Sequence, residues 1–133
     1  MTSLADALRT LLRDRRDLGT VVLFGSCARG AEGARSDIDI AVLPPGDLSA
    51  AAEADVEDAV ARLTGREVDL VRLDRTEDLV LRREIARGIP LREHSPGAFA
   101  RFAADAALAW LDLEPTYRDA EARFLRRVAR HAR

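Results

Sequence analysis

The sequence predicts an α/β fold: a small mixed β-sheet backed by helices and followed by a C-terminal helical tail. Two observations favour this class. Short apolar runs rich in β-branched residues alternate with longer segments whose apolar residues recur at helical spacing. Acidic residues also stand on neighbouring strands of this pattern, and strands that alternate with helices pack in layers around one core. The 133 residues, 47% of them hydrophobic, suffice for one such domain but not for two.

Helix signals open the chain and alternate with strand signals over its first two thirds. Ser3, with Asp6 three residues later, resembles a capping box, and leucines then recur at helical spacing, so a helix is expected over residues 3–16. Residues 66–73 alternate apolar and polar positions, as in a strand. The other elements are expected as follows: strand 20–24, short helix 26–29, strand 38–43, helix 49–63 with Leu63 on its inner face, helix 76–87 and edge strand 89–93.

The last third of the chain differs in character. Residues 99–111 predict a helix rich in alanine and aromatic residues, Asp112–Pro115 is expected to break it, and residues 117–131 predict a second, strongly charged helix. That last helix is rich in arginine although the whole chain has a net charge of −2, which favours a partner with an acidic face. The chain is thus expected to comprise a domain over residues 1–95 and, over residues 96–133, helices that pack on the domain or on a partner.

The candidate site lies between the first two strands. An apolar run stops at Gly25 and Ser26, and Asp37 and Asp39 open the next run. Because side chains alternate along a strand, the two acids point the same way, about 7 Å apart at their Cα atoms. Such a pair resists joint ionisation unless a cation lies between its members, and Mg²⁺ binds one or two carboxylates together with nucleotide phosphates. Gly25 lets the backbone approach a phosphate, and the Ser26 hydroxyl and the N–H groups of a helix begun there can donate to it.

These residues carry a family resemblance. Gly25-Ser26, ten residues and then Asp37-x-Asp39 resemble the signature of the DNA polymerase β-like nucleotidyltransferases, and G-S-C-A-R-G with S-D-I-D-I-A-V is similar to their minimal branch, the MNT proteins. The resemblance covers residues 1–95 and implies the nucleotidyltransferase fold. It also implies attack by an acceptor hydroxyl on the α-phosphate of ATP, with two Mg²⁺ ions held by Asp37, Asp39 and Asp69. Gly25 and Ser26 would then hold the β- and γ-phosphates.

Other site residues are less distinctive. Asp69 takes the place of the third family acid; the competing interpretation is an exposed strand residue paired with an arginine, in which case Glu67 is the alternative. Ser36 and the two arginines that flank the loop, Arg29 and Arg35, are candidates for holding the triphosphate, although such arginines are also common on solvated surfaces. Cys27 stands where relatives often carry arginine.

The composition excludes several classes of protein. The net charge of −2 gives no indication of a general nucleic-acid or membrane-surface binder, and no apolar run approaches the roughly 20 residues that span a bilayer. The only cysteine rules out a disulfide framework and is compatible with the reducing cytosol, so a cytoplasmic protein is expected. The chain contains no lysine, so it has neither a Walker A loop nor a Schiff base, and no asparagine or glutamine to read adenine edges.

The acceptor is inferred from the resemblance alone. MNT proteins are often paired with HEPN-domain toxins, which implies AMP transfer to a hydroxyl, expected to be a tyrosine, of a HEPN ribonuclease toxin, with this protein as the antitoxin. Two alternatives remain open: a small-molecule acceptor, as in the aminoglycoside nucleotidyltransferases, or a binding module that inhibits a toxin by contact alone. An intact charged triad counts against the binding module.

Overall fold

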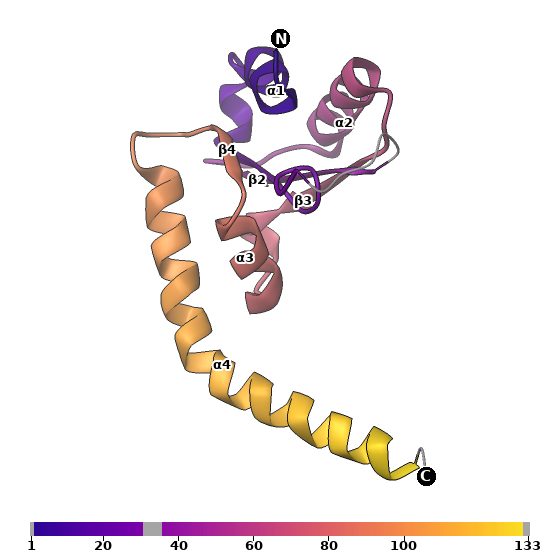
Figure 1. Ribbon diagram of the computed structural model, residues 1–133. Coiled ribbons are helices and arrows are strands. Elements are labelled where there is room, and N and C mark those ends of the chain that lie inside the picture. Colours follow the sequence, from indigo (N-terminus) through magenta and orange to yellow (C-terminus); the bar gives the residue numbers. More distant parts are fainter. Residues whose placement is uncertain (1, 31–35, 132–133) are drawn as a thin grey trace.

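A four-stranded mixed sheet forms the centre of the computed structural model, which describes residues 2–30 and 36–131. Its strands lie in the order β3-β2-β1-β4 (Figure 1). The central pair, β1 and β2, is antiparallel; β4 is antiparallel to β1 at one edge, and β3 is parallel to β2 at the other. The strand bounds are β1 Thr20–Phe24, β2 Ile38–Leu43, β3 Val68–Arg72 and β4 Ile89–Arg92.

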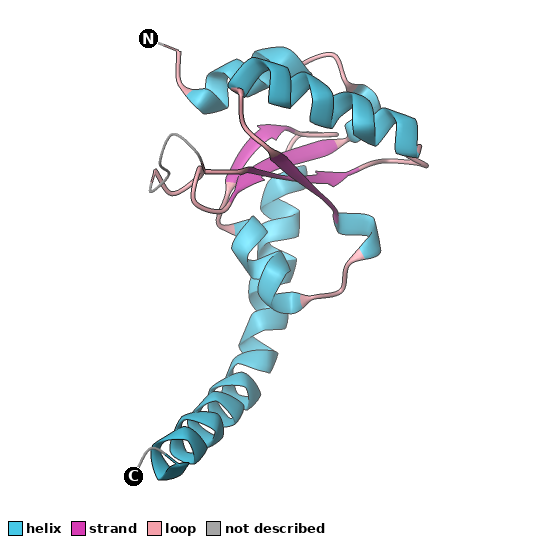
Figure 2. Ribbon diagram, turned by 90° about the vertical axis from the view of Figure 1, so that its right-hand side faces the viewer, coloured by secondary structure: helices cyan, strands magenta, loops and turns pink. Residues whose placement is uncertain are grey.

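Helices cover both faces of the sheet. Figure 2 shows the two layers on either side of the strands. The helices α1 (Leu4–Leu12) and α2 (Ala50–Thr64) pack on one face, and α3 (Leu79–Ala86) and the first part of α4 (Ala98–His131) pack on the other. The predicted α/β architecture is therefore confirmed.

Alternation along the central strands divides the core between the two layers. Val21 and Leu23 pack with the α1 and α2 side, whereas Val22 and Phe24 pack with the α3 and α4 side. All five residues of β1 are buried, as expected for a strand covered on both faces. In β2, Ala41 belongs to the α3 and α4 side. Asp39, two residues earlier, therefore points to that same side.

Local signals place most element boundaries. β1 and β2 have the bounds predicted from the sequence. The Ser3 and Ser49 hydroxyls cap α1 and α2, each accepting a backbone N–H at 3.1 Å, and Asp78 caps α3. The cap at Asp78 explains why α3 begins later than predicted.

Four further expectations about the helices are wrong. α1 ends at Leu12, four residues early, and a short 3₁₀ turn at Arg16–Leu18 follows it. Residues 26–29 form a turn that is too short to be a helix. Leu63 is 49% exposed, because α2 meets the sheet only along the stripe of Val56 and Val60. The fourth error concerns the C-terminal part of the chain.

The C-terminal part is one long helix and not two. α4 continues through Pro115, and Figure 1 shows it changing direction part-way along. Proline removes one backbone donor and crowds the carbonyl four residues earlier, which kinks a helix without necessarily ending it. An ion pair from Glu114 to Arg118 spans Pro115, and a second from Asp119 to Arg123 supports the turn that follows. None of the described helices is long and apolar enough to cross a membrane.

Candidate active site

Strand register brings two of the three predicted acids side by side. Asp39 in β2 is the direct register partner of Asp69 in the parallel neighbour β3. Neighbouring strands lie about 4.8 Å apart, and residues in register share a face of the sheet. Asp37 directly precedes β2 and lies two residues before Asp39, on the same side. Asp37 and Asp69 are exposed while Asp39 is partly buried, so the acids form an open group at one end of β2 and β3.

The electrostatics of Asp39 reflect this crowding. Burial raises the pKa of its carboxyl above the ordinary value of 3.8, and the negative charges of Asp69 and then Asp37 raise it further. Within the described residues, no three His, Cys, Asp or Glu side chains are gathered closely enough to form a ready-made metal site. A hard divalent cation does not need three protein ligands, because Mg²⁺ takes one or two carboxylates and completes its shell with phosphate and water. The pair Asp39 and Asp69, with Asp37 beside it, fits such an ion.

The turn after β1 is built around the Asp39 carboxylate. Gly25 has a φ of +75°, and a Cβ atom there would lie 2.3 Å from Asp39 Oδ2, so any side chain would clash with the acid. The carboxylate therefore lies directly against the backbone of the turn. Ser26 follows, partly buried, and the carbonyl of Gly25 accepts the N–H groups of Ala28 and Arg29 at 3.2 and 3.3 Å.

Cys27 has a structural position in this turn. The side chain is buried in the core, and its thiol donates to the backbone carbonyl of Asp37 at 3.3 Å. It also accepts a long contact of 3.6 Å from Arg66. Cys27 thus links the turn to the residue before β2. Sequence reasoning missed this contact because ten positions separate Cys27 from Asp37 in the chain.

The remaining predicted site residues lie in different surroundings. Arg29 follows the turn, and its guanidinium is paired with the carboxylate of Glu84 on α3. Ser36 is partly buried directly before Asp37, and Arg35 lies outside the described residues. Asp69, and not Glu67, is the register partner of Asp39. No arginine forms an ion pair with Asp69 in the part of the chain that the structure describes.

A small cavity of about 90 Å³ separates the turn from the end of α3. Gly88 lines it and packs tightly against β1, since a Cβ atom there would meet the Leu23 carbonyl oxygen at 2.4 Å. Sequence reasoning missed the α3 residues of this cavity because they lie more than fifty residues from the turn. The lining consists of Gly25, Ala28, Arg29, Glu84, Arg87 and Gly88.

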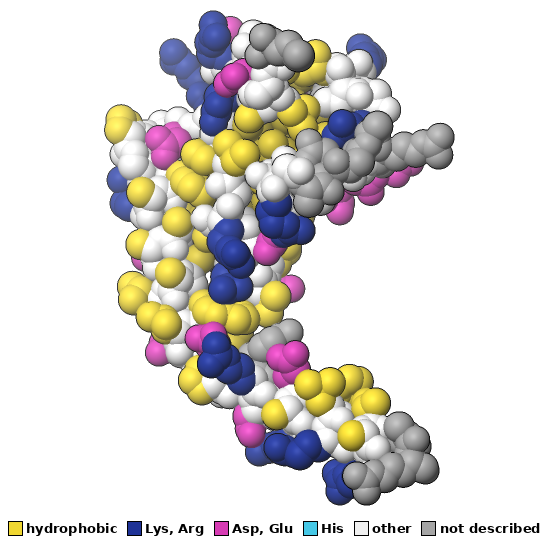
Figure 3. All heavy atoms as spheres, viewed as in Figure 1, with side chains coloured by type: hydrophobic (Ala, Val, Ile, Leu, Met, Phe, Trp, Pro, Cys, Tyr) yellow, Lys and Arg dark blue, Asp and Glu magenta, His cyan; other side chains and the backbone are white. Residues whose placement is uncertain are grey.

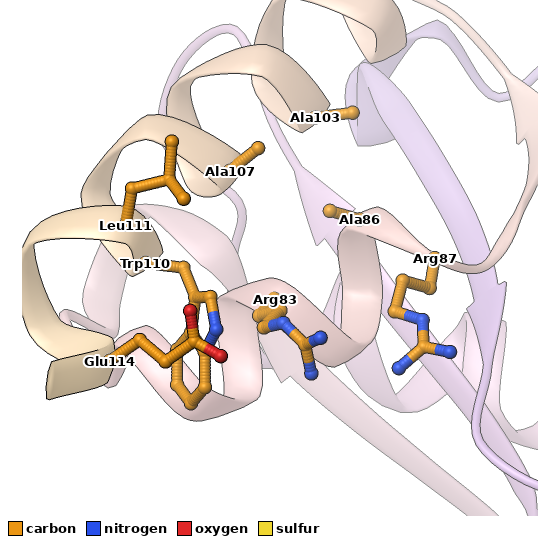
Figure 4. Close-up of a pocket in the computed structure, with 8 residues that line it drawn as sticks. All are labelled: Arg83, Ala86, Arg87, Ala103, Ala107, Trp110, Leu111 and Glu114. Carbon is orange, nitrogen blue, oxygen red and sulfur yellow. The ribbon is translucent and has the colours of Figure 1, made fainter. Parts of the chain in front are cut away.

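A larger groove of about 460 Å³ lies between α3 and α4 and shares Arg87 with the small cavity. Figure 4 shows Arg83 and Arg87 extending from α3, with Trp110 and Leu111 contributed by α4. The Arg83 guanidinium stacks over the Trp110 ring at 4.7 Å. None of the three acids lines this groove, so the groove is separate from the acids.

Comparison with known proteins identifies the family. Residues 6–96 match the family model described as polymerase beta, nucleotidyltransferase. The protein belongs to this nucleotidyltransferase family. The match covers the sheet, the Gly25 turn and all three acids, and the family predicted from the sequence is confirmed. No curated protein sequence matches this nucleotidyltransferase.

Several solved structures share the fold of this nucleotidyltransferase. One chain of a toxin–antitoxin complex with AMP-PNP is 27% identical, with 91% of this chain and 98% of that chain covered and a TM-score of 0.71. A chain of the MntA–HepT toxin–antitoxin complex is 25% identical, with 92% and 97% covered and a TM-score of 0.65. A structure of tri-AMPylated Shewanella oneidensis HEPN toxin in complex with MNT antitoxin matches at 25% identity, with 92% and 96% covered and a TM-score of 0.66.

Proposed function

We propose that this nucleotidyltransferase transfers AMP from ATP to a tyrosine hydroxyl of a cognate HEPN ribonuclease toxin in the cytoplasm, and thereby acts as its antitoxin. The observation that carries the chemistry is the packing of the Gly25 backbone against Asp39, beside Asp69 in register. This arrangement combines a phosphate-sized turn with a carboxylate pair. The protein acceptor is supported by the toxin–antitoxin complexes that share the fold over more than nine tenths of the chain.

Each residue of the site would have its own role in the reaction. Ser26 and the backbone after Gly25 would hold the β- and γ-phosphates, with Arg29 beside them. Asp37, Asp39 and Asp69 would hold two Mg²⁺ ions, which when bound stabilise the attacking and leaving oxygens. Asp69, which is exposed, would help to take the proton of the incoming hydroxyl. The open position of the acids leaves room for an acceptor presented by another protein.

The far half of α4 is suited to contact that partner. After Glu114, every described side chain except Ala122 is exposed, including the large apolar Phe124, Leu125 and Val128. Figure 3 shows apolar and basic side chains together on this part of the helix. Beyond Pro115 the sequence has six arginines and two acids, so a second basic helix of the same kind would repel it. We therefore expect a partner surface with apolar and acidic side chains for this part of the helices within residues 96–133.

The small-molecule alternative has less support. A cationic acceptor such as an aminoglycoside needs an acidic pocket, whereas the groove beside α3 has Arg83 and Arg87 against the single acid Glu114. That basic rim does not suit a cationic drug.

The decisive test is transfer of label from α-labelled ATP with Mg²⁺, with this protein alone and with its neighbouring gene product. The Asp37→Asn/Asp39→Asn variant is the control. Label on the partner that disappears in the control is the expected result. If the two proteins form a tight complex and no label moves, the catalytic proposal is wrong.

The second candidate function is neutralisation of the toxin by contact alone. The exposed apolar side chains Phe124, Leu125 and Val128 on α4 favour it. Growth rescue by the Asp39→Asn variant separates the two. A variant that still neutralises the toxin would show that contact suffices, whereas loss of rescue with an intact complex would show that transfer is required.

A further inference from the structure

We propose that Arg87, at the end of α3, binds the terminal phosphates of the nucleotide together with Arg29, and that Glu84 holds Arg29 in place until those phosphates arrive. This inference rests on the proposed function and deepens it. It assigns a second cation to the phosphate site from a helix far from the sequence motif. It also assigns a role to the carboxylate that already contacts Arg29.

The small cavity has the size and the lining for an oxyanion. Its volume of about 90 Å³ is far below the roughly 300 Å³ of a site for a whole small molecule, but equals about three water volumes. Gly25, Gly88 and Ala28 contribute little side-chain bulk to the walls, so backbone and guanidinium groups define the space. A phosphate group fits such a space, whereas a nucleoside does not.

The cavity continues the site already described. Gly25 lines the cavity, and its backbone also lies against the Asp39 carboxylate. An anion in the cavity would therefore lie next to the acids that are proposed to hold the α-phosphate end. The terminal phosphates of one nucleotide can occupy the cavity while its α-phosphate stays by the acids.

The charges in the cavity favour an anion once Glu84 moves aside. The lining has two cations, Arg29 and Arg87, and one anion, Glu84, whose carboxylate is paired with the Arg29 guanidinium. Arg29 is 57% exposed and Glu84 35%, and exposed ion pairs of this kind contribute only about 0–1 kcal/mol. A phosphate carries more charge and accepts two parallel hydrogen bonds from one guanidinium. A bound nucleotide can therefore take Arg29 from Glu84 at small cost.

A purely structural role for Arg87 must be distinguished from this one. A cation in the last turn of a helix also interacts favourably with the helix dipole, by about 0.3–1 kcal/mol. Arg83 lies one turn earlier on the same helix, extends to the same side in Figure 4 and stacks on Trp110, and it does not line the small cavity. Arg83 is therefore a matched control for charge on α3.

The test measures binding of ATP, inorganic tripolyphosphate and AMP by calorimetry in the presence of Mg²⁺. In Arg87→Ala, affinity for ATP and tripolyphosphate should fall about tenfold, while affinity for AMP is unchanged. Arg83→Ala should bind all three as the wild type does. Glu84→Gln should bind ATP about two- to fivefold more tightly, because Arg29 is no longer held by a charge. Thermal unfolding of each variant confirms that it is folded.

The outcomes separate the two proposals. If Arg87→Ala matches the wild type, or weakens AMP as much as ATP, the role of Arg87 is wrong while the proposed function stands. If Arg83→Ala weakens ATP equally, the effect is one of general charge and the inference fails. If the wild type binds tripolyphosphate through Arg87 but does not bind ATP, the anion site is real and the proposed nucleotidyl transfer is wrong.

Discussion

At the scale of single residues, the contact between Gly25 and Asp39 sets the geometry of the site. A methyl group at Gly25 would lie 2.3 Å from the carboxylate oxygen, and the φ of +75° already disfavours a side chain. We expect Gly25→Ala to lower the transfer rate about a hundredfold, because displacement of a reacting group by about 1 Å has effects of that size. Labelled AMP transfer under single-turnover conditions measures it.

Gly65 provides the matched control for this substitution. It caps α2 with a φ of +68°, and nothing lies within 4 Å of a Cβ atom built there. Gly65→Ala should therefore have the same backbone strain, about 1 kcal/mol, with normal activity. Equal losses of activity in the two variants would show that strain, and not contact with Asp39, is responsible.

The ionised Asp39 carboxylate should lower the stability of the fold, although the proposed reaction needs it. The folded state raises the pKa of its carboxyl, so the folded protein binds the proton more strongly than the unfolded chain. Stability then falls as the pH rises from the ordinary value of 3.8 through the raised pKa, and it stays lower at neutral pH. With metal chelated, Asp39→Asn should unfold at a higher temperature than the wild type at pH 7, and this advantage should vanish below about pH 3.8.

The same variant should lose transfer activity by roughly 10²–10³-fold, the usual effect of removing one electrostatic stabiliser. Differential scanning calorimetry across the pH range and the labelled transfer assay measure the two effects. A lower unfolding temperature for Asp39→Asn at pH 7 would contradict the account of charge crowding.

At the scale of elements, one buried arginine joins β3 to α2. The Arg72 side chain is 8% exposed and donates from Nε and Nη2 to Asp74 at 2.9 and 2.6 Å. Its Nη1 donates to Glu53 at 2.9 Å and to the Leu48 carbonyl at 3.0 Å. The hydrogen bonds from Asp74 and then Glu53 raise the pKa of Arg72, so it stays charged at every relevant pH. These hydrogen bonds, here called the Arg72 fork, hold the start of α2 against the end of the strand that carries Asp69.

We expect Arg72→Ala to lower the free energy of unfolding by about 3 kcal/mol, because it leaves partly buried carboxylates without their cation. Urea unfolding measures the change. Arg118 is the control: it also pairs with a carboxylate, Glu114, but is 74% exposed, so Arg118→Ala should change stability by less than about 0.5 kcal/mol. If the two variants are equally stable, the Arg72 fork does not hold the elements together.

At the scale of the whole molecule, the two parts of α4 have different surroundings. The first part of α4 packs on α3 through Phe102, and Ala106 is also buried, whereas the part after Pro115 extends away from the sheet (Figures 1 and 3). A chain that stops after Pro115 should therefore unfold at the same temperature as the full chain, within about 2 °C. It should lose most of its affinity for the partner.

Calorimetric unfolding and a binding assay with the neighbouring gene product test this difference. A variant with Phe124, Leu125 and Val128 changed to alanine provides the second measurement, because it keeps the helix and its charges. Undiminished binding by both variants would place the partner surface elsewhere.

Local pattern was sufficient to predict much of this protein. The bounds of β1 and β2 follow from alternating apolar residues that end at glycine and proline turns, and the helix starts follow from Ser3 and Ser49. The fold family and the Gly25, Asp37 and Asp39 cluster could be predicted for the same reason: their spacing is a property of one short stretch of chain. Whether these residues catalyse transfer stays a prediction.

Tertiary structure decided what depends on distant parts of the chain. Pro115 kinks α4 without ending it, since neighbouring turns and side-chain pairs keep the helix continuous despite the lost hydrogen bond. The register of β2 with β3 places Asp69, and not Glu67, beside Asp39. The pairing of β4 with β1 brings Glu84 and Arg87 to the Gly25 turn across more than fifty residues. Sequence patterns record which neighbours a residue has along the chain, whereas these contacts arise only when strands pair and bring separate segments together.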